Sequence, residues 1–351
     1  QLRRGGVVGA ENGWLLREDC APDGDELAVK ATGSALVLTD RASGHLARLA
    51  LMSGDQFACV EARGRASTRL AGLTVLSAGC GALHFYEDSA VAIDGGHIQK
   101  SGTADARFPA IEARERSQPT LRGLRIDNSG GRGFFVHGEA RPVLREVALS
   151  GVGGAGMEVQ GEAVLDVADL SVSEAAGAGV VVRGEASGRL TRLSTDRTTN
   201  VGLAIGGNAR LQVDGVKVGF AEGFGLRVGG AARATVRDLS SELLGAHGVQ
   251  AHADCALTLV DASLRLGRFD GVQVSERARL IMRGGRVTEH QGRGVVASGD
   301  CKVRIERTVL EGNQGWQLLA RDQAEVRLVD CTPAGPVQRQ DAASIDDGGA
   351  S

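Results

Sequence analysis

The chain has 351 residues, of which 52 are glycine and 6 are proline, and only 3% are aromatic. Its formal net charge of −3 gives no general attraction to nucleic acid or to an anionic membrane, so binding to a polyanion would need a local basic patch. No apolar run reaches the ~18 residues that a membrane-spanning helix needs, and Gln1-Leu2-Arg3-Arg4 lacks the apolar stretch of a signal peptide. This composition excludes a Pro-rich linker and a core built on aromatic packing.

The first part of the chain is expected to begin a repeat array. Residues 1–40 should supply the first strands and the cap that covers the open end of the core. Residues 64–86 form one coil of this array, and the next coil, 87–114, is longer by five residues. Insertions in repeat arrays become protruding loops, so a loop is expected at 99–108.

The central part of the chain repeats with a period of about 23 residues, and this register continues without a gap from Glu115 to Arg321. In eight consecutive repeats one column of the register holds glycine: Gly133, Gly156, Gly179, Gly202, Gly225, Gly248, Gly271 and Gly294. Each glycine opens a segment such as Gly179-Val180-Val181-Val182, in which apolar side chains lie two apart, as is typical of a strand with one buried face. A fixed period of this size indicates stacked supersecondary units.

Two turns separate the strands of each repeat. The first is rich in glycine, as in Ser129-Gly130-Gly131-Arg132, where we expect that positive φ is needed and that a Cβ would clash. The second follows the glycine-led strand, as in Gly138-Glu139-Ala140. Short strands alternating with turns predict an all-β solenoid with about 12 coils of about 23 residues over 41–331, whose coils stack ~4.8 Å apart. The polar segment 332–351 is expected to be a disordered tail or a linker.

Two other repeat folds share part of this pattern. Leucine-rich repeats have a similar period, but they continue with Asn or Cys where this chain has Ser129, Val152 and Ala175, followed by Gly-rich strands. A left-handed helix of hexapeptides would have coils of ~18 residues. The pattern therefore favours a right-handed parallel β-helix.

The Gly-led strands and Gly-Glu-Ala turns resemble the parallel β-helix repeats of the pectin-lyase-like superfamily over about residues 41–331. The resemblance implies the fold but not the activity, because that superfamily holds polysaccharide lyases, glycoside hydrolases, epimerases, phage tailspikes, adhesins and non-catalytic scaffolds. The motifs of its galacturonase-like enzymes are missing from the coils. The only Asp-Asp pair, Asp346-Asp347, lies beyond the coils. Aromatic platforms for sugars are scarce, since Trp14, Trp316 and Tyr86 are the only Trp and Tyr residues.

A carboxylate ladder is the first candidate binding site. Glu139, Glu162 and Glu185 occupy one column in three successive coils, and like charges at that spacing repel unless something offsets them. His137 and Arg141 flank the column and could supply the offset, in which case the face is a solvated mixture of charges. The alternative is a site for a cation or a cationic ligand.

A loop and a turn are the other candidates. The loop at 99–108 carries three charged side chains, Lys100, Asp105 and Arg107. Loops on a rigid scaffold commonly carry recognition, although a neutral insertion is the alternative. In the Gly-rich turn, one column holds His247, Arg293 and Trp316, with Phe220 and Phe224 nearby. Exposed aromatic side chains favour partner binding, but Trp316 could equally cover the last coils.

The cysteines and the remaining histidines have no ligand spacing. The six cysteines are therefore expected to be small buried hydrophobes, although Cys59 and Cys80 lie about one coil apart, which leaves a disulfide open. His84, His97 and His290 are expected to be isolated structural residues.

A regular repeat without a convergent catalytic set predicts a non-catalytic scaffold. It would present one lateral face to a protein or polysaccharide partner, without nucleic acid and without a cofactor. The alternative is a polysaccharide lyase, glycoside hydrolase or epimerase, for which bound calcium is expected; a trimeric virion or cell-surface fibre is a third hypothesis. The compartment and oligomeric state stay open, with a secreted, periplasmic or cell-surface location favoured over the cytoplasm.

Overall fold

The computed structural model describes residues 7–10, 14–16, 23–54, 56–102 and 104–347. In these residues the regular structure consists of β-strands that pair in parallel, and no helix is long and apolar enough to cross a membrane. The chain divides into two compact units, Gln1–Gly177 and Ala178–Ser351.

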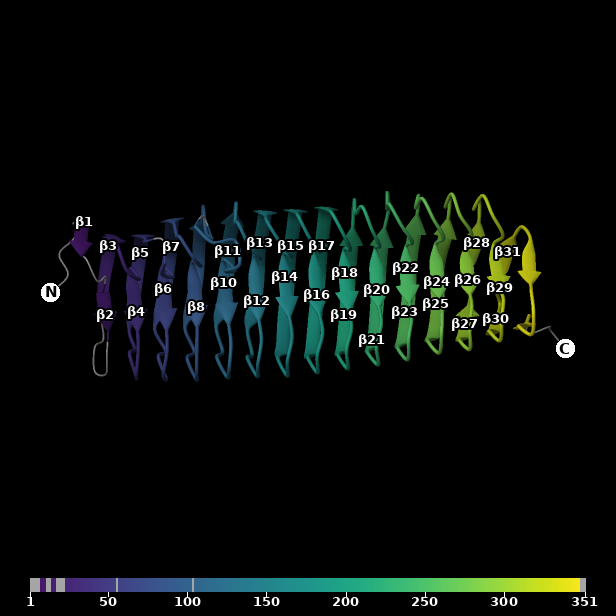
Figure 1. The fold of residues 1–351 in the computed structure, drawn as a ribbon, viewed down its shortest axis with the longest axis horizontal. Helices are drawn as coiled ribbons and strands as arrows, with labels where there is room; N and C mark the ends of the chain where they lie inside the picture. The colour runs from purple at the N-terminus through teal and green to yellow at the C-terminus, as the bar shows by residue number, and fades with distance from the viewer. Residues whose placement is uncertain (1–6, 11–13, 17–22, 55, 103, 348–351) are drawn as a thin grey trace. The chain divides into compact units, whose positions relative to one another are not determined.

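In the first unit the chain alternates between a sheet of mostly long strands and a sheet of three-residue strands (Figure 1). The long-strand sheet contains β1 (Val7–Ala10), β3 (Asp23–Ala31), β5 (His45–Met52), β7 (Arg69–Ser77), β9 (Ala92–Ile98), β11 (Thr120–Asp127), β13 (Val143–Val152) and β15 (Val164–Ala175). The short-strand sheet contains β2 (Trp14–Leu16), β4 (Leu36–Leu38), β6 (Val60–Ala62), β8 (Leu83–Phe85), β10 (Ile111–Ala113), β12 (Phe134–Val136) and β14 (Met157–Val159).

The second unit has the same alternation. Its long-strand sheet contains β17 (Ser187–Thr198), β19 (Arg210–Val218), β21 (Arg233–Ser241), β23 (Ala256–Arg265), β25 (Arg279–Thr288), β27 (Lys302–Glu306), β28 (Val309–Glu311), β30 (Glu325–Val329), β31 (Thr332–Ala334) and β33 (Ser344–Asp346). Its short-strand sheet contains β16 (Val180–Val182), β18 (Leu203–Ile205), β20 (Leu226–Val228), β22 (Val249–Ala251), β24 (Val272–Val274), β26 (Val295–Ala297), β29 (Leu318–Ala320) and β32 (Val337–Arg339).

The strand register reproduces the sequence period. Ile111 pairs with Phe134, and Phe134 pairs with Met157, so each residue pairs with its equivalent one repeat later. The step from Leu83 to its partner Ile111 is five residues longer, so the predicted longer coil is present and its extra residues lie in the turn between β9 and β10. Inward side chains such as Leu83, Ile111 and Phe134 are buried in the core between the two sheets.

The end of the chain differs from the expected tail. In the segment 332–351 the structure has β31, β32 and β33, each paired with a strand of the preceding coil. Few of these side chains are apolar, which is why composition alone predicted disorder. The open edge of a sheet offers unpaired backbone groups, and the segment satisfies them: Ser344 N–H, for example, donates to the Ala324 carbonyl at 2.9 Å. The described chain makes about 14 turns, slightly more than expected.

The glycine column lies where successive coils approach most closely. A Cβ on Gly133 would lie 2.5 Å from the carbonyl oxygen of Gly156, and a Cβ on Gly248 would lie 2.5 Å from that of Gly271. None of these four glycines has a positive φ. At these glycines the stacking leaves no room for a side chain, whereas the equivalent positions of other coils hold Ala82, Ala110 and Gln317.

The two turns use glycine for different reasons. The prediction of positive φ in the Gly-rich turn is wrong for Gly130 and Gly153, whose φ values are ordinary. The predicted clash is correct there, since a Cβ on Gly153 would lie 2.0 Å from the Gly130 carbonyl oxygen. Positive φ occurs in the other turn, at Gly138 (71°) and Gly161 (78°).

The described cysteines are all free thiols, so Cys59 and Cys80 form no disulfide, and Cys20 lies outside the described residues. Burial raises the pKa of Cys59 to about 12 and that of Cys301 to about 11. Because the thiolate is the reactive form, we expect iodoacetamide at about pH 8 to leave Cys59 and Cys301 unmodified until the protein unfolds. Peptide mass spectrometry checks this, and labelling of Cys59 as fast as that of half-buried Cys331 would contradict it.

Candidate active site

Ionisable side chains gather on one face of the short-strand sheet in the first unit. The central residue of each three-residue strand points away from the core, because its two neighbours point inward. From β6 to β14 these central residues are Glu61, His84, Glu112, Phe135 and Glu158, and they pair in sequence through the strand register. Side chains far apart in the sequence therefore become neighbours, ~4.8 Å apart along one column.

A second column lies two residues further along each coil. It holds Arg63, Tyr86, Arg114 and His137. Side chains of both columns line a cavity of about 350 Å³, and the Gly-rich turn closes its other side with Phe57, Phe108 and Pro109. The cavity combines a histidine, a tyrosine, carboxylates and guanidinium groups in one concave site, which is the usual form of an active site.

His84 and Tyr86 are joined at the wall of this cavity. The Nδ1 atom of His84 lies 2.8 Å from the Tyr86 hydroxyl. A carboxylate oxygen of Glu112 lies 3.9 Å from the same Nδ1, and its other oxygen lies 3.0 Å from Nε2 of His137. The phenol thus contacts one imidazole at hydrogen-bond distance, and the carboxylate lies close to that imidazole and at hydrogen-bond distance from the other.

Burial determines the protonation states of this cluster. It lowers the pKa of His84, although the negative charge of Glu112 opposes the shift. It raises the pKa of Tyr86 to about 12. Burial also works against the charge of Glu112, but the hydrogen bond from His137 and the nearby positive charges outweigh it and hold the pKa of Glu112 below its usual value. At neutral pH the cluster therefore contains a neutral His84, a protonated phenol and a carboxylate.

Two guanidinium groups cover the Tyr86 ring. The Arg114 guanidinium carbon lies 4.0 Å from the ring centroid and that of Arg63 lies 5.3 Å away. Arg63 also pairs with Glu61 at 2.5 Å. Buried Nε of Arg114 and buried Nε2 of His84 have no hydrogen-bond partner among the described residues. Buried polar atoms without such a partner are rare and mark places that a ligand or water completes.

Gly81 allows the His84 ring to occupy its position. A Cβ on Gly81 would lie 2.2 Å from His84 Nε2 and 2.7 Å from the carbonyl oxygen of Pro109. The ring therefore lies directly against the Gly81 backbone. Phe108 stacks on its face, with ring centroids 6.4 Å apart. These contacts hold the imidazole in one orientation.

Arginines also line the opposite part of the cavity. Arg132 forms an ion pair with Glu158, and its guanidinium lies 4.8 Å from the Phe135 ring. Arg107 extends from the inserted loop and pairs with Asp105 at 2.6 Å. Hydrogen bonds from Arg107 lower the pKa of Asp105 to about 2. Four arginines therefore line the cavity, and Arg63, Arg107 and Arg132 each pair with a carboxylate.

Three of the residues singled out in the sequence lie at this cavity. Arg107 lines it, Asp105 holds Arg107, and His137 donates a hydrogen bond to the Glu112 carboxylate. Lys100 and Arg141 are exposed and are not among the lining residues.

The carboxylate ladder is part of a mixed-charge column. Glu139 and Glu162 are exposed. Arg116 precedes Glu139 in the same column, and the negative charge of Glu139 helps to raise the pKa of Arg116. Arg116 also forms a bidentate pair with Asp88 at 2.7 and 3.0 Å. The offset to Glu139 therefore comes from within its own column. Glu185 belongs to the second unit, and a ligand site at the ladder stays a prediction.

The prediction that His84 and His97 are isolated is wrong. His84 contacts Tyr86 and Glu112, and Nε2 of His97 lies 2.7 Å from an Asp127 oxygen. The signal was present in the sequence: ionisable residues recur at the central position of consecutive short strands, once the five-residue insertion is counted. In the second unit that position is mostly non-ionisable, as at Val181, Ala204, Gln250, Gln273, Val296 and Leu319.

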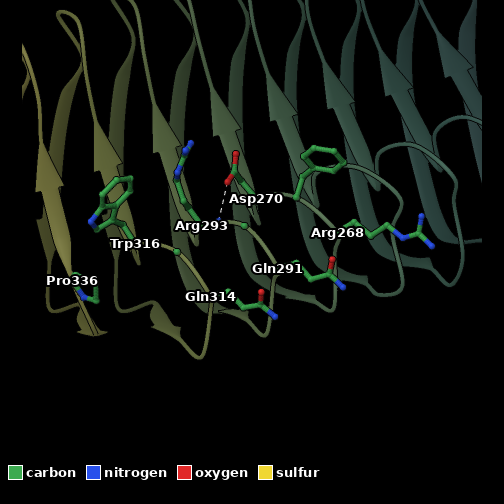
Figure 2. Close-up of a pocket in the computed structure, with 10 residues that line it drawn as sticks. Arg268, Asp270, Gln291, Arg293, Gln314, Trp316 and Pro336 are labelled. Atoms are coloured by element: carbon green, nitrogen blue, oxygen red, sulfur yellow. Dashed lines mark hydrogen bonds between the residues drawn. The ribbon is translucent and has the colours of Figure 1, made fainter.

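The third predicted region is a groove in the second unit, at the Gly-rich turn (Figure 2). Arg293 and Trp316 line this groove, which has a volume of about 790 Å³. His247 lies one coil before Asp270 and accepts a hydrogen bond at Nδ1 from the Asp270 N–H at 3.1 Å. Phe224 stacks on His247 with ring centroids 5.8 Å apart. Two members of the predicted column, Arg293 and Trp316, thus line the groove, and His247 contacts the lining residue Asp270.

Comparison with known families agrees with the architecture. Residues 81–264, more than half of the chain, match the family model described as "right handed beta helix region". A comparison with curated proteins found no match.

Solved structures of similar fold include two kinds of epimerase. A double mutant of the periplasmic alginate epimerase AlgG has a TM-score of 0.59 and 10% identity, covering 80% of this chain and 76% of that chain. The Azotobacter vinelandii mannuronan C-5 epimerase AlgE6 A-module has a TM-score of 0.57 and 14% identity, covering 87% and 91%. At these identities the likeness shows the fold alone.

Proposed function

The chain belongs to the right-handed β-helix family, and we propose that it is a polysaccharide-active enzyme with its active site in the cavity around His84 and Tyr86. The single observation that carries the proposal is the buried contact between His84, Tyr86 and Glu112 in a cation-rich cavity. The sequence showed no such convergent set, and for that reason it favoured a scaffold. The cluster and the names of the structures with similar folds favour the enzyme alternative.

The proposed substrate is a polysaccharide that contains uronate residues. Alginate and mannuronan, named for the epimerases of similar fold, are such polymers. The C5 hydrogen of a uronate lies α to its carboxylate, so its removal needs a base and a cation that stabilises the charge developing on the carboxylate. The cavity contains both kinds of group.

Tyr86 and His84 are the proposed proton-transfer pair. Neutral His84 accepts the phenol proton at Nδ1, and the Tyr86 oxygen takes the C5 proton as the C5–H bond breaks. The electron pair moves into the carboxylate, which becomes an enediolate. Glu112 stabilises the positive imidazole across the 3.9 Å contact.

Arg114 is the proposed partner of the substrate carboxylate. Its guanidinium lies over the Tyr86 ring at 4.0 Å, and its buried Nε has no hydrogen-bond partner among the described residues but forms an ion pair with a Glu115 oxygen 3.7 Å away. A guanidinium can bind a carboxylate through two parallel hydrogen bonds and so hold C5 beside Tyr86. We expect Arg114→Gln to lower kcat/KM on a uronate polymer about 10²- to 10³-fold, because the charge on the enediolate loses its partner.

Arg116→Gln is the matched control for that variant. Arg116 is exposed two residues further along the chain and pairs with Asp88 outside the cavity. The kcat/KM of the Arg116→Gln variant should stay close to that of the unchanged protein. Equal losses in the two variants would show that Arg114 acts through general charge and not through the substrate.

Two outcomes are open to the enediolate. Delivery of a solvent proton to the other face of C5 inverts the sugar, and the abstracted proton returns to solvent. Loss of the 4-O-linked sugar, whose oxygen takes up a proton, instead breaks the chain and leaves an unsaturated end. We favour inversion, since the similar folds carry epimerase names. Hydrolysis fits less well, because it needs a carboxylic acid whose pKa is raised, and that of Glu112 is lowered.

Incubation of uronate polymers with the protein in D₂O separates these reactions. Poly-mannuronate, poly-guluronate and poly-galacturonate would each be followed by mass spectrometry, NMR and absorbance. Inversion places deuterium at C5, elimination produces absorbing unsaturated ends without C5 deuterium, and hydrolysis produces new reducing ends alone. We expect deuterium and an inverted C5 on at least one polymer; no C5 chemistry on any of them would leave the proposal without support.

The acid side of the pH profile should report His84. Its pKa is lowered by burial below the ordinary value of 6.5, and only the neutral ring can accept the phenol proton. Turnover should therefore be full at neutral pH and fall about tenfold for each pH unit below the His84 pKa. The measurement is kcat/KM against pH, and an acid limb with an apparent pKa well above 6.5 would contradict this role.

A location outside the cytoplasm is part of the proposal. It is supported by the word periplasmic in the name of the AlgG structures and by the polymeric substrate. Fractionation of cells that produce the protein from its full-length gene tests it, and recovery in the cytoplasmic fraction would contradict it.

A further inference from the structure

The groove in the second unit is built from two rows of side chains (Figure 2). One row consists of Arg268, Gln291 and Gln314, which are all exposed. The other consists of Asp270, Arg293 and Trp316. Neighbouring members of each row are one repeat apart, so they lie at equivalent places in successive coils, ~4.8 Å from one another.

Glycines form the floor between the rows. Gly292 N–H donates to the Phe269 carbonyl at 3.2 Å, and Gly315 N–H donates to the Gly292 carbonyl at 2.9 Å. A Cβ on Gly292 would lie 2.7 Å from Asp270 Oδ1, and a Cβ on Gly315 would lie 2.9 Å from Cγ of Arg293. The close approach of successive coils therefore excludes a side chain at Gly292 and at Gly315.

Buried hydrogen bonds hold one wall in place. Asp270 is only 8% exposed, and its Oδ1 accepts from the Arg293 backbone N–H at 2.8 Å. Its own N–H donates to His247 Nδ1 at 3.1 Å. Phe269, at 55% exposure, packs against the His247 ring with centroids 5.6 Å apart. The Asp270 carboxylate thus braces the backbone, while the guanidinium of Arg293 extends beyond it.

The groups that reach the groove suit a sugar with a carboxylate. Arg268 and Arg293 supply guanidinium groups, which bind carboxylates in bidentate geometry. Gln291 and Gln314 supply amides that can donate to and accept from hydroxyl groups. The Arg293 guanidinium lies over the Trp316 ring, 5.6 Å from its centroid, so a cation and an indole lie together at the groove.

We propose that this groove is a second binding site of the protein, for an oligosaccharide that carries carboxylate groups. The choice of a uronate oligosaccharide as the ligand rests on the proposed function. The assignment of the groove as a binding site does not depend on that function. Repetition of one polar side chain from coil to coil matches a ligand made of identical units. A peptide would instead need distinct apolar pockets for its side chains, whereas most of the lining is polar or glycine and its apolar members are Phe269, Trp316 and Pro336.

Trp316 provides a local probe of the groove. The chain has two tryptophans, so in a Trp14→Phe background Trp316 is the only one. Titration with a uronate oligosaccharide, under excitation selective for tryptophan, should produce a saturable change in emission. A neutral gluco-oligosaccharide of equal length should produce none. Absence of a change with the uronate ligand, or an equal change with the neutral one, would overturn the proposal.

Arg293→Gln and Arg233→Gln in the same background are a matched pair. Arg233 is an exposed arginine of β21 outside the groove. Arg293→Gln should weaken uronate binding about tenfold or more, whereas Arg233→Gln should leave it unchanged. Equal weakening in both would overturn the groove as the site. An acidic peptide that binds more tightly than the uronate ligand would overturn the ligand class.

The two proposals can fail independently. Trp316 emission reports the groove, and turnover in D₂O reports the cavity of the first unit. Turnover without a Trp316 response would refute the second site alone. A Trp316 response without turnover would support the second site and count against the enzyme.

Discussion

Tyr86→Phe is expected to reduce kcat on a uronate polymer about 10³-fold and to leave the folded structure intact. The substitution removes only the hydroxyl that lies 2.8 Å from His84 Nδ1. The ring keeps its packing beneath Arg114 at 4.0 Å, so KM should change little. His84→Gln should cause a similar loss, because the phenol then lacks a group to receive its proton. Initial rates and circular dichroism spectra check both variants.

His97→Gln is the control for the histidine variant. His97 is part of β9 and pairs with Asp127 on the long-strand sheet, and it does not line the cavity. Its rate should equal that of the unchanged protein. If Tyr86→Phe and His84→Gln kept their activity, the reaction would have to be assigned to other residues. A loss in His97→Gln as large as in His84→Gln would indicate a general effect on folding.

Gly248→Ala is expected to destabilise the second unit by about 1–3 kcal/mol. The new Cβ would lie 2.5 Å from the Gly271 carbonyl oxygen, and this oxygen cannot move aside without breaking the register of two coils. That same oxygen accepts a hydrogen bond from Val249 N–H at 2.8 Å. Denaturant unfolding measures the effect as a lower midpoint.

Gly206→Ala is the matched control for that variant. Gly206 also lies in the second unit, has an ordinary φ and would have no atom within 4 Å of an added Cβ. Its substitution should be neutral or should stabilise the protein by about 0.4–1 kcal/mol, because alanine lowers the entropy of the unfolded chain. Equal destabilisation by the two substitutions would mean that backbone entropy, and not close approach, explains the glycine column.

The sequence by itself determined the repeat, and with it the fold. A β-solenoid places each residue directly above its equivalent one coil earlier, so steric limits act on every coil at the same position. The glycine column that runs from Gly133 to Gly294 reflects such a limit and is visible without coordinates. The longer coil before Glu115 was visible for the same reason, since an insertion in a turn does not alter the register that follows.

Only the tertiary structure decided how the chain ends and where the chemistry lies. Strands β31 to β33 form because a preceding coil offers unpaired backbone groups, which local composition does not record. The contact of His84 with Glu112 depends on the five-residue insertion between β9 and β10, because the insertion sets which residue pairs with His84 in the next coil. The lowered pKa of His84 depends on its depth below the Gly-rich turn. Depth and contacts across coils are properties of the stacked chain, so residues that look isolated in sequence became one cluster.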